Sequence, residues 1–260
     1  MTVHFVGAGP GAADLLTLRA VRLLQESPVC LYAGTYLDAE VLAHCPPGAE
    51  LVDTQRLDLD TITAHLVDAH ARGLDVARLC SGDPSLYSAV AEQGRRLDAA
   101  GVPWDVTPGV PAYAAAAALV GRELTVPEVA QTVVLTRAQR DSTAMPAGED
   151  LDAYAATGAT LVLHLAIRHT RVLAERLAAH YGADCPVVVG AAVSTPREVV
   201  IRTTLAEVAD RVEQAGLRQA SVILVGRALA AEGFAESHLY GTRERRAGVP
   251  RPGADPTGIG

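Results

Sequence analysis

Three short loops built from glycine and proline constrain the fold of this chain more than any other feature. They are Gly7–Gly11 (GAGPG), Ser81–Pro84 (SGDP) and Thr107–Ala112 (TPGVPA). Each loop follows a short apolar run that is typical of a buried strand, and each precedes a helical pattern. Repeated strand–loop–helix units predict a parallel sheet, in which the loops at the carboxyl ends of neighbouring strands line one crevice. We therefore expect the three loops to lie together at a ligand-binding site.

The first half of the chain alternates between strands and helices. Leu18, Val21 and Leu24 recur at helical spacing after Thr17, which is a suitable N-cap. The expected strands are 3–6, 29–32, 76–80 and 104–107, and the expected helices are 17–25, 61–71, 86–99 and 112–119. Because helices separate the strands, this sheet should be mostly parallel and covered by helices on both faces.

The segment Gly121–Pro127 interrupts this alternation and is predicted to be a linker between two domains. Beyond it, the expected strands are 132–136, 160–165, 187–189, 199–202 and 222–225, and the expected helices are 170–180 and 205–215. The strand–turn–strand pattern over 187–202 indicates antiparallel pairing and hence a mixed sheet. We thus predict an α/β fold with an N-terminal domain over 1–120, a C-terminal domain over 128–246 and an active-site cleft between them. Residues 247–260 are rich in proline and glycine and are predicted to be disordered.

Composition excludes several classes of function. The chain has 260 residues and a formal charge of −8, so it lacks the basic field that attracts nucleic acid. All 22 basic residues are arginine, which excludes both a Walker phosphate loop and Schiff-base chemistry on a lysine. No apolar run is long enough to cross a membrane, and no spacing of histidine or cysteine predicts a metal site. Four cysteines without redox spacing, and a start without signal-like character, predict a protein of the cytoplasm.

The first loop also permits another interpretation, a dinucleotide-binding turn. Gly7, Gly9 and Ala12 satisfy the GxGxxG/A pattern after a strand. Pro10, however, removes a backbone donor where a pyrophosphate needs one, and the second strand ends without the acid that would hold a ribose. Asp83 in the second loop has its own alternative, since an aspartate just before a helix is commonly an N-cap.

Taken together, the three loops resemble the tetrapyrrole methylase family, whose members transfer a methyl group from S-adenosylmethionine to a modified porphyrin ring. The resemblance covers residues 2–246 and rests on GAGPG followed by DLLT, then SGDPSLYS, then TPGVPA. Shorter segments are similar to the precorrin-4 C-11 methyltransferases of cobalamin synthesis: Leu31–Thr35, Leu135–Arg137 with Arg140 and Met145–Pro146, and Ser237–Tyr240. Thr35 stands where these enzymes usually have serine, and Gly241–Arg243 departs from their usual aromatic ending.

The resemblance implies S-adenosylmethionine as the methyl donor, held in the cleft between the two domains, and S-adenosylhomocysteine as the product. The implied contacts with the donor come from the three loops and from two strand ends of the second domain: Pro10, Ser81, Gly82, Asp83, Leu86, Pro111, Ala112, Leu165 and Ala192. Small residues around an apolar slot, with a few backbone donors and acceptors, suit adenine and ribose.

The implied acceptor is precorrin-4, which is methylated at C-11 to give precorrin-5. A precorrin bears many carboxylates, and arginine binds a carboxylate with two parallel hydrogen bonds. Arg137 and Arg140 follow the first expected strand of the second domain, and Arg168 lies just beyond another strand. We expect these three arginines to bind the acceptor.

The resemblance leaves the catalytic base and the exact acceptor open. Asp83, Tyr113 and His164 are candidates for the base, with a core role as the alternative for His164. Cobalt-precorrin-4 and uroporphyrinogen III are alternative acceptors, and a protein side chain, as in diphthine synthesis, is a more distant one. The family also implies a homodimer.

Overall fold

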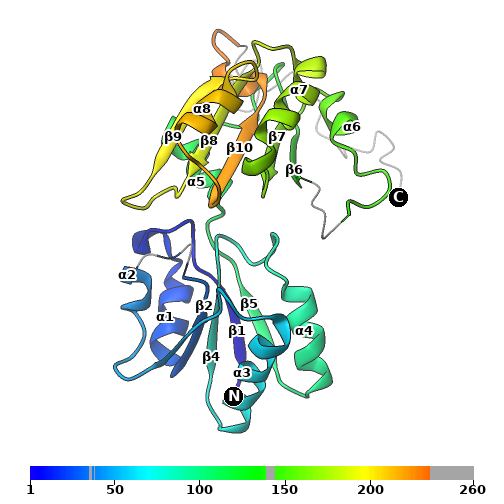
Figure 1. The fold of residues 1–260 in the computed structure, drawn as a ribbon. Coiled ribbons are helices and arrows are strands. Elements are labelled where there is room, and N and C mark those ends of the chain that lie inside the picture. The colour runs from blue at the N-terminus through cyan, green and yellow to red at the C-terminus, as the bar shows by residue number, and fades with distance from the viewer. Residues whose placement is uncertain (35–36, 38, 139–143, 235–260) are drawn as a thin grey trace, which may run out of the picture.

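The computed structural model describes residues 1–34, 37, 39–138 and 144–234. Each half of the chain builds one five-stranded sheet, and the two halves lie one above the other in Figure 1. The first sheet contains β1 (Val3–Gly7), β2 (Val29–Tyr32), β3 (Glu50–Asp53), β4 (Val76–Cys80) and β5 (Trp104–Thr107). The second contains β6 (Val133–Arg137), β7 (Thr160–His164), β8 (Pro186–Ala191), β9 (Val199–Thr204) and β10 (Ser221–Val225). The predicted α/β fold with two sheets is confirmed.

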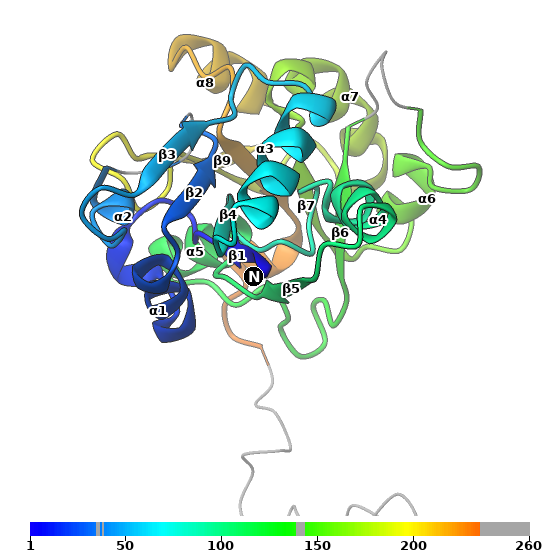
Figure 2. The same cartoon turned by 90° about the horizontal axis from the view of Figure 1, so that it is seen from below.

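The first sheet is entirely parallel, in the order β3-β2-β4-β1-β5. Helix α1 (Leu18–Glu26) and the short α2 (Ala39–Leu42) cover one face, whereas α3 (Leu59–Ala71) and α4 (Val90–Ala99) cover the other (Figure 2). Thr17 caps α1 as the sequence predicts, because its Oγ1 accepts a hydrogen bond from the N–H of Ala20 at 3.1 Å. The predicted helix-covered parallel sheet is therefore present.

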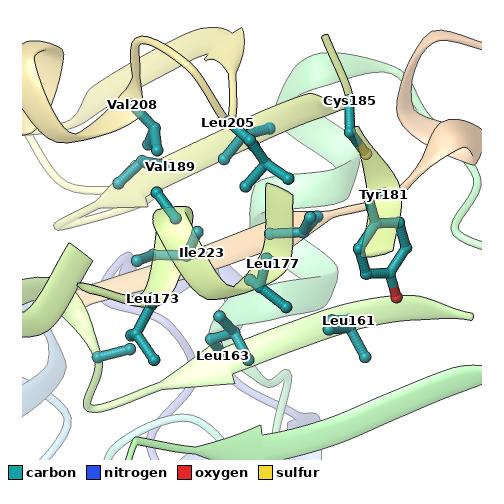
Figure 3. Close-up of a cluster of buried hydrophobic side chains, with 14 of the residues drawn as sticks. Leu161, Leu163, Leu173, Leu177, Tyr181, Cys185, Val189, Leu205, Val208 and Ile223 are labelled. Carbon is teal, nitrogen blue, oxygen red and sulfur yellow. The ribbon is translucent and has the colours of Figure 1, made fainter. Parts of the chain in front are cut away.

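The second sheet is mixed, as predicted, in the order β6-β7-β10-β8-β9. Only β6 and β7 pair in parallel; β10 is antiparallel to β7 and β8, and β8 is antiparallel to β9. The helices α6 (Leu151–Ala155), α7 (Thr170–Tyr181) and α8 (Val208–Gln214) cover one face. Figure 3 shows this core, in which Leu173 and Leu177 of α7 pack with Leu161, Leu163 and Ile223 of the strands.

Helix α5 (Ala112–Val120) follows the third loop of the first half but packs against the second sheet. Its buried residues Ala116 and Val120 share a core with Val162, Val188 and Leu224, and α5 lies beside the second sheet in Figure 1. The domain bounds and the linker at 121–127 stay predictions, while α5 itself packs with the second half of the chain.

Several parts of the fold differ from the sequence expectation, among them the short helices α2 and α6, which were not expected. The helix expected from residue 86 begins at Val90, because Tyr87 and Ala89 have left-handed backbones with φ of 54° and 52°. The edge strand β3 was not expected, because it has a charged residue at each end and no buried residue to give an apolar pattern. Short 3-10 helices that were also not expected lie at Ala13–Leu15, Ile167–His169 and Arg227–Ala230.

Candidate active site

The three glycine-containing loops meet at one edge of the first sheet. Strand β1 lies between β4 and β5, so the loops after Gly7, Cys80 and Thr107 leave from adjacent parallel strands. The first two loops pair through their backbones: the N–H of Gly82 donates to the carbonyl of Gly9 at 2.7 Å, and the N–H of Gly9 donates to that of Gly82 at 3.2 Å. The expected convergence of the loops is therefore present.

The third loop can approach the other two only because it carries glycine at 109. A Cβ on Gly109 would collide with the carbonyl oxygen of Gly82 and with the Cα of Gly7. Gly82 itself has φ of +68°, a conformation that glycine adopts at little cost. These requirements explain why glycines stand where the loops meet.

Asp83 ties the second loop to the third. One carboxylate oxygen accepts a hydrogen bond from the N–H of Gly109 at 2.8 Å, and the other accepts from the N–H of Ser85 at 2.9 Å and from the Ser85 hydroxyl. Burial by itself would raise the pKa of Asp83, but the hydrogen bonds from Ser85 and Gly109 outweigh burial and hold that pKa below its usual value. These contacts favour a role for Asp83 in fixing the loops over a role as a base.

A cleft of about 840 Å³ is lined by residues of both halves and includes the loops. All nine residues that the sequence predicts to contact the methyl donor lie in its wall: Pro10, Ser81, Gly82, Asp83, Leu86, Pro111, Ala112, Leu165 and Ala192. The first loop also contacts the second half, since the N–H of Ala12 donates to Ser194 Oγ at 3.1 Å. Residues far apart in the sequence therefore share one site, while their contact with a ligand stays a prediction.

Left-handed residues that are not glycine gather in the wall of this cleft. Leu165, Ala192 and Ala220 follow or precede strands of the second sheet with φ of 54°, 45° and 52°. Tyr87 and Ala89 add two more from the first half. Such conformations cost about 1–3 kcal/mol each and concentrate at functional sites. Backbone strain thus marks the cleft independently of the loop motifs.

His164, at the end of β7, is a partly buried residue in the wall of the cleft. Its Nε2 is buried and has no hydrogen-bond partner among the described residues, and His164 lines the cleft. Its ring lies 5.3 Å from that of Tyr87 and 6.4 Å from that of Tyr113, measured between centroids. Burial lowers the pKa of His164, so the ring is neutral at physiological pH. Tyr113 supports this ring but does not itself line the cleft.

Positive charge is concentrated in the cleft although the whole chain is acidic. Four of its described lining residues are arginines, Arg78, Arg168, Arg197 and Arg218, whereas Asp83 is the one acidic lining residue. Sequence reasoning proposed only Arg168 among these. For Arg78 a signal was available, because a charged residue interrupts the apolar run Val76–Cys80 directly before the second loop.

The three arginines expected at the acceptor have different positions. Arg168 lines the cleft, and its Nε donates to the carbonyl of Arg218 at 3.1 Å. Arg137 lines a smaller pocket of about 230 Å³, and its guanidinium donates to the carbonyls of Ala138 and Ala144. Arg140 lies outside the described residues. The structure therefore places one of the three in the main cleft.

Neither a metal site nor a membrane-spanning helix is present among the described residues. No three of their histidine, cysteine, aspartate or glutamate side chains are arranged to hold a metal ion. None of their helices has the length and apolar character needed to cross a membrane.

Comparisons with known proteins agree in family and fold. The model of the family described as Tetrapyrrole (Corrin/Porphyrin) Methylases matches residues 2–209. A precorrin-4 C(11)-methyltransferase of Rhodococcus erythropolis is 58% identical over 246 residues, which cover 94% of this chain and 99% of that protein.

Two solved structures are similar to this chain in their three-dimensional fold. A cobalt precorrin-4 methyltransferase, a cobalamin biosynthetic enzyme, superposes with a TM-score of 0.85 and 35% identity, covering 88% of this chain and 96% of its own. A uroporphyrin-III C-methyltransferase of Thermus thermophilus, in complex with S-adenosylhomocysteine, superposes with a TM-score of 0.74 and 31% identity, covering 88% and 99%.

Proposed function

The chain belongs to the tetrapyrrole (corrin/porphyrin) methylase family, and we propose that it transfers a methyl group from S-adenosylmethionine to C-11 of precorrin-4, giving precorrin-5 in cobalamin synthesis. The observation that carries this proposal is the 58% identity, over nearly the whole length of both chains, with a precorrin-4 C(11)-methyltransferase. Identity with the cobalt precorrin-4 methyltransferase is only 35%. The difference favours the metal-free acceptor.

The chemistry of the cleft wall fits a nucleoside without phosphates. Pro10 offers no N–H to a pyrophosphate, and the small residues Gly82, Ala112 and Ala192 leave space for a flat base. Bound S-adenosylmethionine would supply an already activated methyl group. The residues of the cleft then have to hold and orient the two reactants, which can contribute roughly 7–11 kcal/mol to catalysis.

The arginines of the cleft suit an acceptor with many carboxylates. Guanidinium groups bind carboxylates with two parallel hydrogen bonds, which fixes orientation as well as position. We propose that Arg168 is one of these contacts, since it lies in the wall of the cleft. A role for Arg137 and Arg140 in acceptor binding stays a prediction, and Arg137 would have to act from the smaller pocket beside the cleft.

Among the three candidates for a base, His164 has the most suitable surroundings. It is neutral, and its Nε2 has no hydrogen-bond partner among the described residues. Both oxygens of Asp83 are already occupied by hydrogen bonds, and Tyr113 contacts the His164 ring instead of lining the cleft. We therefore propose that His164 accepts a hydrogen bond or a proton when the acceptor is bound.

Acceptor identity is tested by incubating the purified chain with isotope-labelled S-adenosylmethionine and, in parallel, precorrin-4, cobalt-precorrin-4 or uroporphyrinogen III. We expect precorrin-4 to gain the mass of one methyl group and to be methylated fastest, with kcat/KM at least about tenfold above that of the cobalt form. Faster turnover of either other acceptor would contradict the proposed acceptor. Failure to bind S-adenosylhomocysteine in a calorimetric titration would contradict the methyltransferase itself.

We further propose, from family membership, that the enzyme is a homodimer and works in the cytoplasm. Light scattering on the purified chain measures the oligomeric state, and a monomer throughout the working concentration range would contradict the dimer.

A further inference from the structure

Arg78 is a charged residue inside a core strand. It belongs to β4, which lies at the centre of the first sheet between β2 and β1. Its neighbours on the same face, Val76 and Cys80, are part of the core under α3 and α4, and Arg78 itself is only 9% exposed. Burial lowers its pKa, yet a guanidinium remains protonated in proteins. The fold therefore keeps a permanent positive charge inside this core.

Every hydrogen-bond partner of this guanidinium in the described structure is a neutral oxygen. Nε donates to Gln93 Oε1 at 3.1 Å, and Nη1 donates to Thr54 Oγ1 at 3.3 Å and to the carbonyl of Leu79 at 3.2 Å. Gln93 and Thr54 are themselves buried, with exposures of 1% and 5%. Among the described residues, Nη2 has no acceptor and no carboxylate pairs with Arg78. A buried charge without a counter-charge is costly, and neutral partners alone would not require a charge here.

The acidic residues on adjoining segments are already engaged. Asp53, at the end of β3, accepts hydrogen bonds from two backbone N–H groups. Asp58 caps α3 through a third backbone N–H, and Asp83 holds the second and third loops together. None of these carboxylates is therefore placed to neutralise Arg78, and its guanidinium is available to an added anionic partner.

Arg78 is open to the cleft described above. It lines the part of the wall formed by the first half, together with Ile62 of α3, Gln93 of α4 and Ser88, which lies between the second loop and α4. We propose that Arg78 binds a carboxylate of a ligand in this part of the cleft. The inference rests on the proposed function, which supplies two sources of such a group: the amino-acid carboxylate of the methyl donor and a side-chain carboxylate of the tetrapyrrole.

The test compares Arg78→Gln and Arg78→Lys with the unmodified enzyme and with Arg95→Gln, an exposed arginine on α4 away from the cleft. Calorimetry measures the affinity for S-adenosylhomocysteine and for 5′-methylthioadenosine, which lacks the amino-acid part. Quenching of protein fluorescence measures the affinity for precorrin-4 in enzyme saturated with S-adenosylhomocysteine. Thermal melting reports whether each variant is folded.

Two outcomes support the proposal and identify the source of the carboxylate. If the donor supplies the carboxylate, Arg78→Gln lowers the affinity for S-adenosylhomocysteine by about tenfold or more. The affinity for 5′-methylthioadenosine then stays within about twofold of that of the unmodified enzyme. If the acceptor supplies it, both nucleosides keep their affinity and precorrin-4 binding weakens by about tenfold or more. In either case Arg78→Lys should lose less affinity for that ligand than Arg78→Gln, and Arg95→Gln should keep the affinity of the unmodified enzyme.

Two other outcomes overturn the proposal. One is a folded variant that binds all three ligands as tightly as the unmodified enzyme. The other is an equal loss for both nucleosides, which would indicate a changed cleft shape and no carboxylate contact. If Arg78→Gln does not fold, Arg78→Lys decides the matter by the same comparison. If the unmodified enzyme binds no S-adenosylhomocysteine, the proposed function fails instead.

Discussion

Among single residues, Asp83 makes the contacts on which the relative position of two loops depends. Its carboxylate oxygens accept hydrogen bonds from Gly109 of the third loop and from Ser85. Asp83→Asn keeps the shape but removes the charge and one acceptor oxygen. We expect the free energy of unfolding to fall by about 1–3 kcal/mol, because bonds to an ionised acceptor are lost. Chemical denaturation at neutral pH measures the change, with the exposed Glu175→Gln as a control that should lie within about 0.5 kcal/mol of the unmodified protein.

The pH dependence of this effect has a definite sign. The pKa of Asp83 in the folded protein lies below its usual value, so its ionised form stabilises the fold above the unfolded pKa of about 3.9. This contribution is lost as the pH falls through the lower, folded pKa. The stability difference between the unmodified protein and Asp83→Asn should therefore shrink below about pH 4. A difference that does not change with pH would contradict the account based on these hydrogen bonds.

At the scale of elements, the sequence correctly predicted the strands and helices that depend on the local pattern of apolar and turn residues. Strands β2, β4 and β5 have the predicted bounds, because each is a short segment with apolar residues that ends directly before a turn. Strand β3 was missed because its pairing with β2, not its own pattern, makes it a strand. The start of α4 was misplaced because the segment between the second loop and α4 has a local sequence pattern typical of a helix, although Tyr87 and Ala89 in it are left-handed.

In the candidate site, too, features set by the local sequence were predictable and features set by tertiary packing were not. Loop residues were predictable because glycine and proline report backbone geometry directly, and all nine expected donor contacts line the cleft. The arginines were less predictable. Arg197 and Arg218 reach the cleft through the arrangement of the second sheet, and Arg137 was expected there but lines the smaller pocket. Where a long side chain ends depends on packing that a single sequence does not encode locally.

The meeting of the three loops gives an element-scale prediction. Gly109→Ala places a methyl group against Gly82 and Gly7, where backbone atoms leave no space. We expect a loss of at least about 3 kcal/mol in the free energy of unfolding, together with weaker binding of S-adenosylhomocysteine. Gly101→Ala is the matched control: it has φ of +66° and no neighbour within 4 Å, so only backbone strain of about 1–2 kcal/mol is expected. Equal losses in the two variants would contradict the close approach of the loops.

At the scale of the whole molecule, charge is separated between surface and site. The chain carries a formal charge of −8, yet the cleft has four arginines against one acid among its described lining residues. A polyanionic acceptor is thus repelled by the molecule as a whole and attracted by the cleft. Clefts lined by one sign of charge focus the field, and salt screens this attraction. The sequence could indicate the need for such a site but not its composition, because the arginines come from both halves.

This separation predicts how salt affects the two ligands. Raising the sodium chloride concentration from about 50 mM to about 500 mM shortens the screening length to a few ångströms, so we expect the KM for precorrin-4 to rise several-fold. S-adenosylhomocysteine carries no net charge, and its affinity should change by less than about twofold over the same range. Initial-rate kinetics and calorimetry measure the two effects. Arg168→Gln should show a higher KM at low salt and a weaker dependence on salt, because one attractive charge is already absent. A KM for precorrin-4 that does not change with salt would mean that exposed arginines do not hold the acceptor carboxylates. Buried contacts, such as that at Arg78, would then have to hold the acceptor, because salt screens buried contacts least.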